Sequence, residues 1–203
     1  MKKLAVLASG GGSNLQSLID QVHLKDGIIA VVISDRKGAY ALQRAADNGI
    51  DAVHIGRKSY ESDMAFNRAI LKTLNTYEVD GIVLAGYLKI LSEEIVDAYS
   101  NKIINVHPAL IPSFCGDGFH GMHVHEAAYK KGVKVSGPTV HFVDAGVDTG
   151  PIILQRAVAL DACDGPEAIQ KKVLKEEHIL LPEAVRLFLQ DRLSVRDGRV
   201  YIE

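Results

Sequence analysis

The sequence is poor in cysteine, has no block of basic residues and lacks any long hydrophobic run. Only two cysteines, Cys115 and Cys163, occur in 203 residues, and they lie far apart. This pattern fits a reduced cytosolic protein better than a disulfide-bonded framework. The formal net charge is -2, so nothing indicates binding to a nucleic-acid backbone.

The apolar runs of the sequence are short. The longest of them fall well below the roughly 20 residues that a membrane-spanning helix needs. At the N-terminus, two lysines and a short apolar run stop at a glycine cluster, whereas a secretory signal peptide needs a longer apolar stretch and a cleavage region. We therefore expect a cytoplasmic protein whose first apolar run is a strand.

Val- and Ile-rich runs alternate with segments that carry an apolar residue at every third or fourth position. Strands that are apolar throughout are typical of a parallel sheet buried on both faces. We therefore predict one α/β domain with a doubly wound, mostly parallel central sheet. The expected strands cover residues 3–9, 27–35, 51–56, 80–86 and 102–107, and the expected helices cover residues 13–24, 40–49, 62–77 and 92–100.

After Pro108 the pattern changes. Two further strands are expected at residues 135–146 and 150–160, as an antiparallel extension of the sheet. A long helix at residues 165–190 contains Pro182, which predicts a kink or a break. The remaining expected elements are a loop at residues 113–123, a short helix at residues 124–131 and a terminal hairpin at residues 193–202 around Asp197-Gly198.

The segment ASGGGSNLQ joins the first expected strand to the first expected helix. Gly10 to Gly12 allow close approach of the backbone to a ligand, and Ser13 and Asn14 would begin a helix whose free N–H groups favour an anion. Leu15 stands where a dinucleotide fingerprint needs its third glycine, and no P-loop lysine follows. We predict a monophosphate site here; the alternative is a tight turn without a ligand.

The segment AGYLKILSEE follows the fourth expected strand, at the edge where doubly wound sheets bind ligands. Four apolar residues and Lys89 could line a pocket for a flat aromatic ligand. From the residues alone, packing of this segment against the following helix is the favoured explanation. The apolar residues are Tyr87, Leu88, Ile90 and Leu91.

The segment IINVHPALIPSF ends an apolar strand with Asn105 and His107, which share one face of an extended chain. His107 is a candidate acid or base, and Asn105 carries an amide suited to an oxygen that gains negative charge. A structural histidine with a capping amide would explain the bare pair. The position at a carboxyl strand edge, followed by Pro108 and Pro112, favours a site.

A glycine-rich bend in HFVDAGVDTGPIILQ carries Asp144 and Asp148. A carboxylate beside His107 would orient its ring and raise its pKa. Spacing along the sequence does not distinguish Asp144 from Asp148 in this role. Asp and Gly are also common in ordinary turns.

Three histidines form an H-x-x-H-x-H pattern in the loop before the short helix. No cysteine pair accompanies them, and one local loop rarely supplies a whole coordination sphere. We therefore expect a solvated loop and no metal. The histidines are His120, His123 and His125.

Five segments, in this order along the chain, resemble the phosphoribosylglycinamide formyltransferases, folate-dependent enzymes of purine synthesis. They are ASGGGSNLQ, GIVLAGYLKILS, INVHPALIPSF, VHFVDAGVDTGPIILQ and EEHILLPEAV, and together they extend over nearly the whole chain. The resemblance implies a single formyltransferase domain with a Rossmann-like fold over residues 1–203. Its phosphate-binding half would cover residues 1–108, and its folate-site half residues 109–203.

The resemblance also implies a one-carbon transfer from 10-formyltetrahydrofolate, the co-substrate, to the amine of 5′-phosphoribosylglycinamide. Asn105, His107 and Asp148 match the family's catalytic positions, which selects Asp148 over Asp144 as the catalytic aspartate. The matches to its ribonucleotide-binding positions are Gly11, Gly12, Ser13, Asn14 and Glu177. The matches to its folate-binding positions are Tyr87, Leu88, Lys89, Ile90, Leu91, Asp144, Ala145, Gly146 and Val147.

We expect small-molecule partners only, with no nucleic acid, membrane or metal, and either a monomer or a homodimer. The chain departs from the family in a longer loop around Cys115, and in lacking a basic residue for the folate tail near residues 62–64. A methionyl-tRNA formyltransferase or a formyltetrahydrofolate hydrolase would need a further domain, for which 203 residues leave no room. A non-catalytic module that binds the same ligands is the rival from another class.

Overall fold

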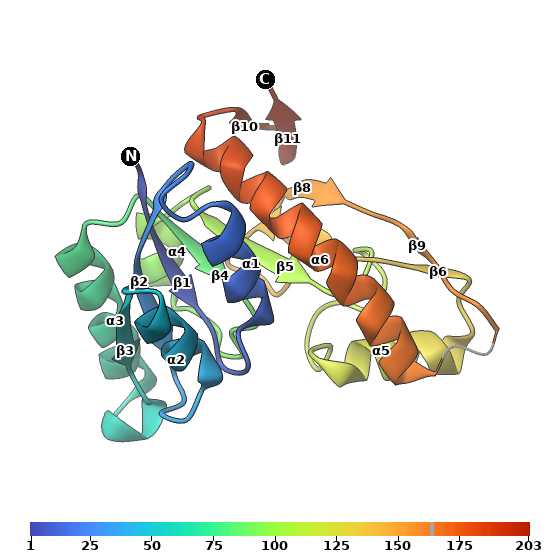
Figure 1. Cartoon of the computed structure of the whole chain (residues 1–203), viewed down its shortest axis with the longest axis horizontal. Helices are drawn as coiled ribbons and strands as arrows, with labels where there is room; N and C mark the ends of the chain where they lie inside the picture. Colours follow the sequence, from blue (N-terminus) through green and yellow to red (C-terminus); the bar gives the residue numbers. More distant parts are fainter. Residues whose placement is uncertain (163–164) are drawn as a thin grey trace. The chain divides into compact units, whose positions relative to one another are not determined.

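The computed structural model describes residues 1–162 and 165–203. Its central sheet has seven strands in the order β3-β2-β1-β4-β5-β7-β8 and is mostly parallel, with flanking helices (Figure 1). The predicted α/β class with an antiparallel extension is confirmed. The chain divides into two compact units, Met1–Ile104 and Asn105–Glu203, called unit 1 and unit 2 below.

Unit 1 contains every strand and helix predicted for the first half of the chain, together with a short 3-10 helix, η1. The strands are β1 (Lys3–Leu7), β2 (Ile28–Ser34), β3 (Asp51–His54), β4 (Gly81–Leu84) and the start of β5 (Ile103–His107). The helices are α1 (Ser13–Gln21), α2 (Tyr40–Asp47), η1 (Arg57–Ser59), α3 (Asp63–Tyr77) and α4 (Glu93–Ala98).

The inner strands of unit 1 are buried along almost their whole length, as their continuous apolar sequences predict. Strand β1 pairs in parallel with β2 and β4, so the loops that follow these strands lie at one edge. There the hydroxyl of Ser9 donates to Asp35 Oδ1 at 2.6 Å and accepts from the Leu88 N–H at 2.9 Å. This buried serine ties together the loops after β1, β2 and β4.

Two serines stand at helix starts in unit 1. Ser62 caps α3, and its Oγ accepts a hydrogen bond from the Ala65 N–H at 3.1 Å, a contact worth about 1 kcal/mol. Ser92 occupies the cap position of α4, but its side chain makes no capping hydrogen bond among the described residues. Only the first of these two capping contacts therefore forms.

The described residues of unit 2 form the rest of β5, two helices and six further strands. The helices are α5 (Met122–Lys131) and α6 (Pro166–Leu189). The strands are β6 (Val135–Ser136), β7 (Thr139–Phe142), β8 (Ile152–Gln155), β9 (Val158–Ala159), β10 (Leu193–Arg196) and β11 (Arg199–Ile202).

Strands β10 and β11 form the predicted terminal hairpin. Its central residues, Asp197 and Gly198, both have positive φ, as a type I′ turn requires. The prediction of this hairpin from the Asp-Gly pair is confirmed.

The two strands predicted at residues 135–146 and 150–160 are each divided, so this part of the prediction is wrong in detail. Strands β7 and β8 pair antiparallel within the main sheet, whereas β6 and β9 form a separate pair. The division falls at Gly137-Pro138, because Pro138 has no N–H for a ladder. Gly137 has φ 145, and a Cβ there would lie 1.9 Å from the carbonyl oxygen of Arg156.

A kink or a break was predicted at Pro182; helix α6 continues through this residue, so no break occurs (Figure 1). A proline inside a helix removes one backbone hydrogen bond and costs about 3 kcal/mol. Packing offsets this cost, because Pro182 is buried and α6 lies against α5, β7, β8 and β9.

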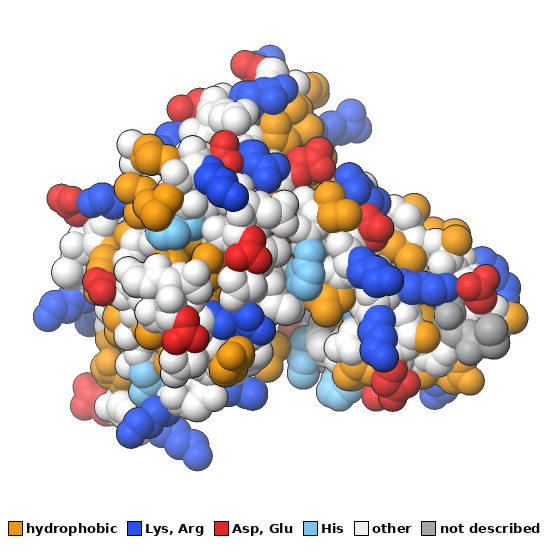
Figure 2. Space-filling model, in the orientation of Figure 1, with side chains coloured by type: hydrophobic (Ala, Val, Ile, Leu, Met, Phe, Trp, Pro, Cys, Tyr) orange, Lys and Arg blue, Asp and Glu red, His pale blue; other side chains and the backbone are white. Residues whose placement is uncertain are grey.

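The surface carries charges of both signs. On the face seen in Figure 2, Lys and Arg side chains are mixed with Asp and Glu side chains over both units. Among residues 1–162 and 165–203, no helix is long and apolar enough to cross a membrane.

Candidate functional site

The end of β5 carries the two polar residues that were predicted from the sequence. His107 is buried, with 4% of its surface exposed, and Asn105 is partly exposed. Nε2 of His107 lies 2.8 Å from the carbonyl oxygen of Phe114. Because a carbonyl oxygen only accepts, Nε2 carries a proton in this structure.

Asp148 is the aspartate that lies beside His107. Its Oδ2 is 3.5 Å from Nδ1 of His107 and accepts a hydrogen bond from the Gly116 N–H at 3.0 Å. Burial lowers the pKa of His107, and the Asp148 carboxylate and the Phe114 carbonyl offset part of that effect.

The bend before β8 fixes the Asp148 carboxylate. Asp148 has φ 57, a left-handed conformation that is uncommon outside glycine. Two residues later, a Cβ on Gly150 would lie 1.9 Å from the Phe142 carbonyl oxygen, so only glycine fits against β7 here. Burial alone would raise the pKa of Asp148, but the rings of His141 and His107, when protonated, and the Gly116 N–H hold it below its usual value.

Asp144 is occupied within its own loop. Its Oδ1 accepts from the Gly146 N–H at 3.1 Å and from the Thr149 hydroxyl at 2.6 Å. The geometry therefore separates the two aspartates that spacing could not separate. Asp148 faces the histidine, and Asp144 closes the bend that contains Ala145, Gly146 and Val147.

His141, in β7, belongs to the same cluster and was not predicted. Its Nδ1 lies 2.7 Å from the Phe142 carbonyl oxygen, and its Nε2 lies 3.1 Å from Nδ2 of Asn105 and 3.6 Å from Oδ1 of Asp148. A polar residue inside the buried stretch Thr139–Phe142 was the only signal for it in the sequence.

The loop after Pro112 supplies backbone groups to this cluster. Phe114 and Gly116 contact His107 and Asp148 as described above, while the Cys115 thiol donates to the Pro112 carbonyl at 3.3 Å. Burial and the Asp148 charge raise the pKa of Cys115, which is a free thiol. Cys163, the other cysteine in the sequence, lies outside the described residues.

The three histidines of the H-x-x-H-x-H pattern do not act as one group. His120 and His123 are exposed, as a solvated loop predicts, and their rings lie 5.0 Å apart. His125 is buried in α5, so the prediction of a solvated loop is wrong for this residue. Within the described part of the chain, no group of three or more His, Cys, Asp or Glu residues could hold a metal ion.

In unit 1, residues 10–12 form a loop, called the glycine loop below, that leads directly into the first turn of α1. Gly12 caps α1 with φ 70, and a Cβ there would lie 2.9 Å from Ala41. The helix then begins with Ser13 and Asn14, as predicted, so their N–H groups belong to its free first turn. Such a helix end favours a phosphate group.

Helix α2 supports this loop. The Ala41 N–H donates to the Gly10 carbonyl at 3.1 Å, and Nε of Arg44 donates to the Gly11 carbonyl at 2.8 Å. A second guanidinium nitrogen donates to Gln16 of α1 at 2.9 Å. This support was not predicted from the sequence, because Arg44 lies 33 residues after Gly11.

The loop after β4 divides into buried and exposed residues. Tyr87 and Leu91 are buried, whereas Leu88, Lys89 and Ile90 are exposed. The exposed residues help to line a pocket of roughly 770 Å³ in unit 1, so packing and pocket lining both occur. The other lining residues are Arg57, Asp63, Met64, Phe66, Asn67, Leu91, Ser92, Glu93 and Glu94.

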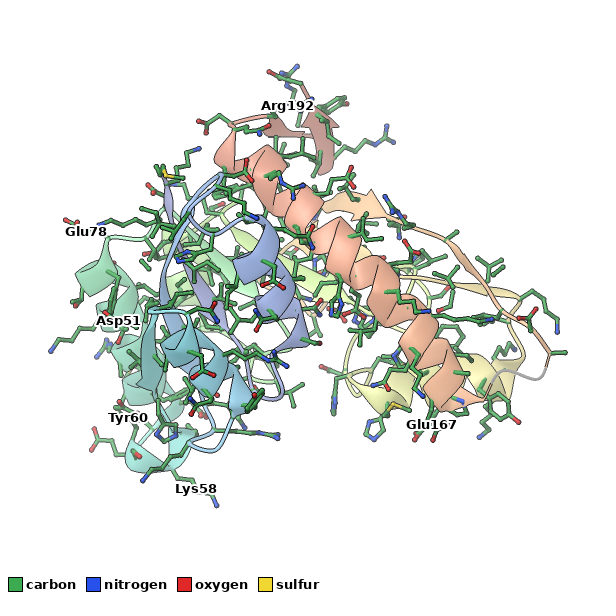
Figure 3. All side chains as sticks on the ribbon, in the orientation of Figure 1. Asp51, Lys58, Tyr60, Glu78, Glu167 and Arg192 are labelled. Atoms are coloured by element: carbon green, nitrogen blue, oxygen red, sulfur yellow. The ribbon has the colours of Figure 1, made fainter. Side chains whose placement is uncertain are left out.

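Arg57 brings a positive charge to this pocket from η1, outside residues 62–64, where the basic residue of some family members is expected to be lacking. Its guanidinium pairs with Asp63 and donates to the Tyr60 carbonyl at 2.8 Å. Figure 3 shows the neighbouring Lys58 pointing away from the molecule.

Glu177, another predicted site residue, lies buried on α6 in unit 2.

Comparison with known proteins identifies the family. The family model for formyl transferase matches residues 2–185. A phosphoribosylglycinamide formyltransferase of Bacillus subtilis (strain 168) is 40% identical over 191 residues, which are 93% of this chain and 95% of the relative. The chain belongs to the phosphoribosylglycinamide formyltransferase family.

Solved structures agree with this membership and with the predicted formyltransferase activity. A glycinamide ribonucleotide transformylase 1 of Symbiobacterium toebii is 44% identical, with a TM-score of 0.94 over 100% of this chain and 94% of that chain. A formyltetrahydrofolate deformylase of Pseudomonas syringae is 27% identical, with a TM-score of 0.88 over 99% of this chain and 65% of that chain. Membership of the family, together with these likenesses, makes the chain a formyltransferase of the purine-biosynthesis type.

Proposed function

We propose that this enzyme transfers the formyl group of 10-formyltetrahydrofolate to the amine of 5′-phosphoribosylglycinamide, giving the N-formyl product in de novo purine synthesis. One observation supports the proposal: Asn105, His107 and Asp148, which the resemblance to the family predicts to be catalytic, belong to one connected cluster of polar side chains in unit 2.

Transfer is direct. The amine nitrogen attacks the formyl carbon, a C–N bond forms, and the carbonyl oxygen becomes an oxyanion that the Asn105 amide N–H stabilises. The bond from the formyl carbon to the folate nitrogen then breaks. One proton leaves the attacking nitrogen, and one is gained by the leaving nitrogen. Because the amine attacks the formyl carbon directly, no protein nucleophile takes part.

His107 carries this proton. Substrate binding replaces the contact of Nε2 with the Phe114 carbonyl, which allows the ring proton to move to Nδ1, on the Asp148 side. Nε2 then accepts the proton from the attacking nitrogen. The resulting imidazolium, paired with Asp148, helps to stabilise the oxyanion and returns the proton to the leaving nitrogen.

The binding roles follow the resemblance to the family. We assign the ribonucleotide phosphate to the N–H groups of Gly11 to Asn14, and its glycinamide amine to the carboxylate of Glu177. We assign folate contacts to Tyr87–Leu91 and to Asp144–Val147. Arg57 and Lys89 supply positive charge for the anionic folate tail.

Further assignments remain predictions of the sequence. These are phosphate binding by residues 1–108, folate binding centred on residues 109–203, a monomeric or homodimeric state, a cytoplasmic location, and the absence of a metal requirement.

The decisive experiment measures formyl transfer by folate absorbance, with the ribonucleotide and a 10-formylfolate as substrates. His107→Ala is expected to lower turnover by about 10²–10⁴-fold, the usual contribution of a positioned acid or base. Circular dichroism and ligand titration should show a folded protein that binds both substrates. Near-wild-type turnover in folded His107→Ala would sink the assignment.

Hydrolysis of the formyl folate is the competing activity, because the deformylase of Pseudomonas syringae shares this fold. A transferase should release little formate when the ribonucleotide is absent and should form the N-formyl product when it is added. A hydrolase should release formate at the same rate in both cases. A binding module should bind both ligands and do neither reaction.

A further inference from the structure

His141 lies in the active cluster without an assigned role. It is 2% exposed, and all four residues of its strand β7 are buried. A buried imidazole costs free energy unless its nitrogen atoms find partners. The partners of the two nitrogens determine what this ring does.

The Nδ1 atom must carry a proton. It lies 2.7 Å from the Phe142 carbonyl oxygen, which has no hydrogen to donate. In the neutral ring, Nε2 is therefore left with a lone pair and acts only as an acceptor. The backbone of β7 thus selects one tautomer of His141.

The partner of Nε2 is the Asn105 amide. Its Nδ2 lies 3.1 Å away, within hydrogen-bond range, whereas Oδ1 of Asp148 lies 3.6 Å away, beyond it. Only the NH₂ end of an amide can donate to a lone pair, so this contact fixes which end of Asn105 points toward His141. One of the two amide N–H groups is used, and the second is held in a defined direction.

We infer that His141 is a positioning residue, whose Nδ1–H tautomer orients the Asn105 amide so that its second N–H faces the reacting formyl oxygen. This inference rests on the proposed function. An oppositely turned amide would present its carbonyl oxygen to the developing oxyanion, and repulsion would replace stabilisation. The same Nε2 atom therefore contacts Asn105 and lies near the Asp148 carboxylate.

Two substitutions separate the roles of the two ring nitrogens. His141→Asn places an amide where Nδ1 stands, so it keeps a donor for the Phe142 carbonyl but loses the acceptor for Asn105. His141→Gln reaches the Nε2 position with an amide oxygen and can still accept from Asn105. A purely structural histidine would make the two variants similar in activity.

We expect His141→Asn to lower kcat by about 10²–10³-fold, the usual effect of losing an oxyanion donor. The KM values for both substrates should stay within a few-fold of wild type. His141→Gln should recover at least about tenfold of the lost kcat. Equal activity of the two folded variants, or a loss confined to KM, would overturn the inference.

A spectroscopic measurement on the unmutated enzyme tests the tautomer directly and does not depend on variant folding. Nitrogen-15 NMR of histidine-labelled protein at neutral pH should show a protonated Nδ1 and an unprotonated Nε2 for His141. A ring protonated only at Nε2, or at both nitrogens, would also overturn the inference. If wild type shows this tautomer but transfers no formyl group, the proposed function fails instead.

Discussion

The glycine loop of unit 1 and the polar cluster of unit 2 both present hydrogen-bond donors, but they make them from different groups. The loop offers backbone N–H groups, and its shape depends on φ 70 at Gly12 and on contacts with α2. The cluster offers side chains whose protonation is set by their neighbours. The first site should therefore be sensitive to steric change, and the second to the replacement of a single atom.

Among the changes that test this comparison, the largest effect is expected from Asp148→Asn, which changes one oxygen to nitrogen and leaves the shape intact. The amide cannot compensate an imidazolium, so proton transfer through His107 loses its partner. We expect turnover to fall by about 10²–10³-fold, comparable to the loss of an oxyanion-hole donor. Steady-state formyl transfer, with thermal unfolding as a check on folding, measures this effect.

Asp144→Asn is the matched control, because Asp144 accepts hydrogen bonds only within its own bend. An amide oxygen can still accept from Gly146 and Thr149, so turnover at saturating folate should stay within a few-fold of wild type. Any loss of the folate contact assigned to this bend should appear as a higher KM for the folate. Equal losses in the two variants would remove the distinction between the two aspartates.

In unit 1, Gly12→Ala should have the next largest effect. The new Cβ would lie 2.9 Å from Ala41 and would oppose φ 70, a conformation that costs an L-residue about 1 kcal/mol or more. We expect KM for the ribonucleotide to rise by about tenfold, one step of 1.4 kcal/mol in binding, with a smaller change in KM for the folate. Initial rates over a range of both substrates separate the two effects.

Gly38→Ala provides the comparison for this change. Gly38 has no atom within 4 Å of an added Cβ, so its replacement should leave both KM values unchanged. If Gly12→Ala behaved like Gly38→Ala, the backbone shape of the loop would not be what binds the phosphate.

The sequence predicted most of the fold, because strands buried on both faces and amphipathic helices leave clear local patterns. It predicted Asn105 and His107 from their position at a strand end, and it needed the family resemblance to choose Asp148. His141 was missed because nothing in the local sequence shows that β7 brings its ring to Asn105. The division at Gly137-Pro138 was missed because close approach to Arg156 is a tertiary contact.

The support of the glycine loop by α2 illustrates the same limit in unit 1. The glycines themselves predicted a site, but Arg44, which donates to the Gly11 carbonyl, is 33 residues away from Gly11. Likewise, Arg57 adds a positive charge to the pocket beside the predicted Lys89 and was not itself predicted. Local patterns indicate where backbone approaches a ligand, whereas long-range pairing determines which side chains complete the site.

Arg44→Ala should weaken the loop without a steric clash. The variant loses the hydrogen bonds to the Gly11 carbonyl and to Gln16 and the stacking of the guanidinium on Tyr40, whose ring centroid lies 4.8 Å away. We expect KM for the ribonucleotide to rise several-fold, and Arg44→Lys to fall between Ala and wild type because one donor remains. Isothermal titration with the ribonucleotide gives an independent value.

Arg68→Ala removes an equal charge from an exposed position, where the nearest acidic oxygen is that of Glu94 at 3.8 Å. Such a surface pair contributes little, so ribonucleotide binding should not change. A rise in KM in both variants would indicate a general effect of charge and not support of the loop.

The smallest effect concerns His125, a buried residue of unit 2 for which the sequence predicted a solvated loop. Burial, with a smaller contribution from His107, lowers the pKa of His125 from 6.5 to about 4. Between these values the unfolded chain binds a proton that the folded chain does not bind. The free energy of unfolding should therefore fall as pH decreases through this window, by up to about 1.4 kcal/mol per pH unit for this one group.

His125→Gln removes that titration, so urea unfolding between pH 7 and pH 4.5 should show a shallower loss of stability than in wild type. His120→Gln, at an exposed position in the preceding loop, should keep the wild-type slope. The buried His107 and the half-buried His178 also have lowered pKa values and will leave part of the slope in place. An unchanged slope in His125→Gln would mean that the His125 ring takes up its proton in the folded protein. The contrast with the backbone-built site of unit 1 would then rest on His107, Asp148 and His141 alone.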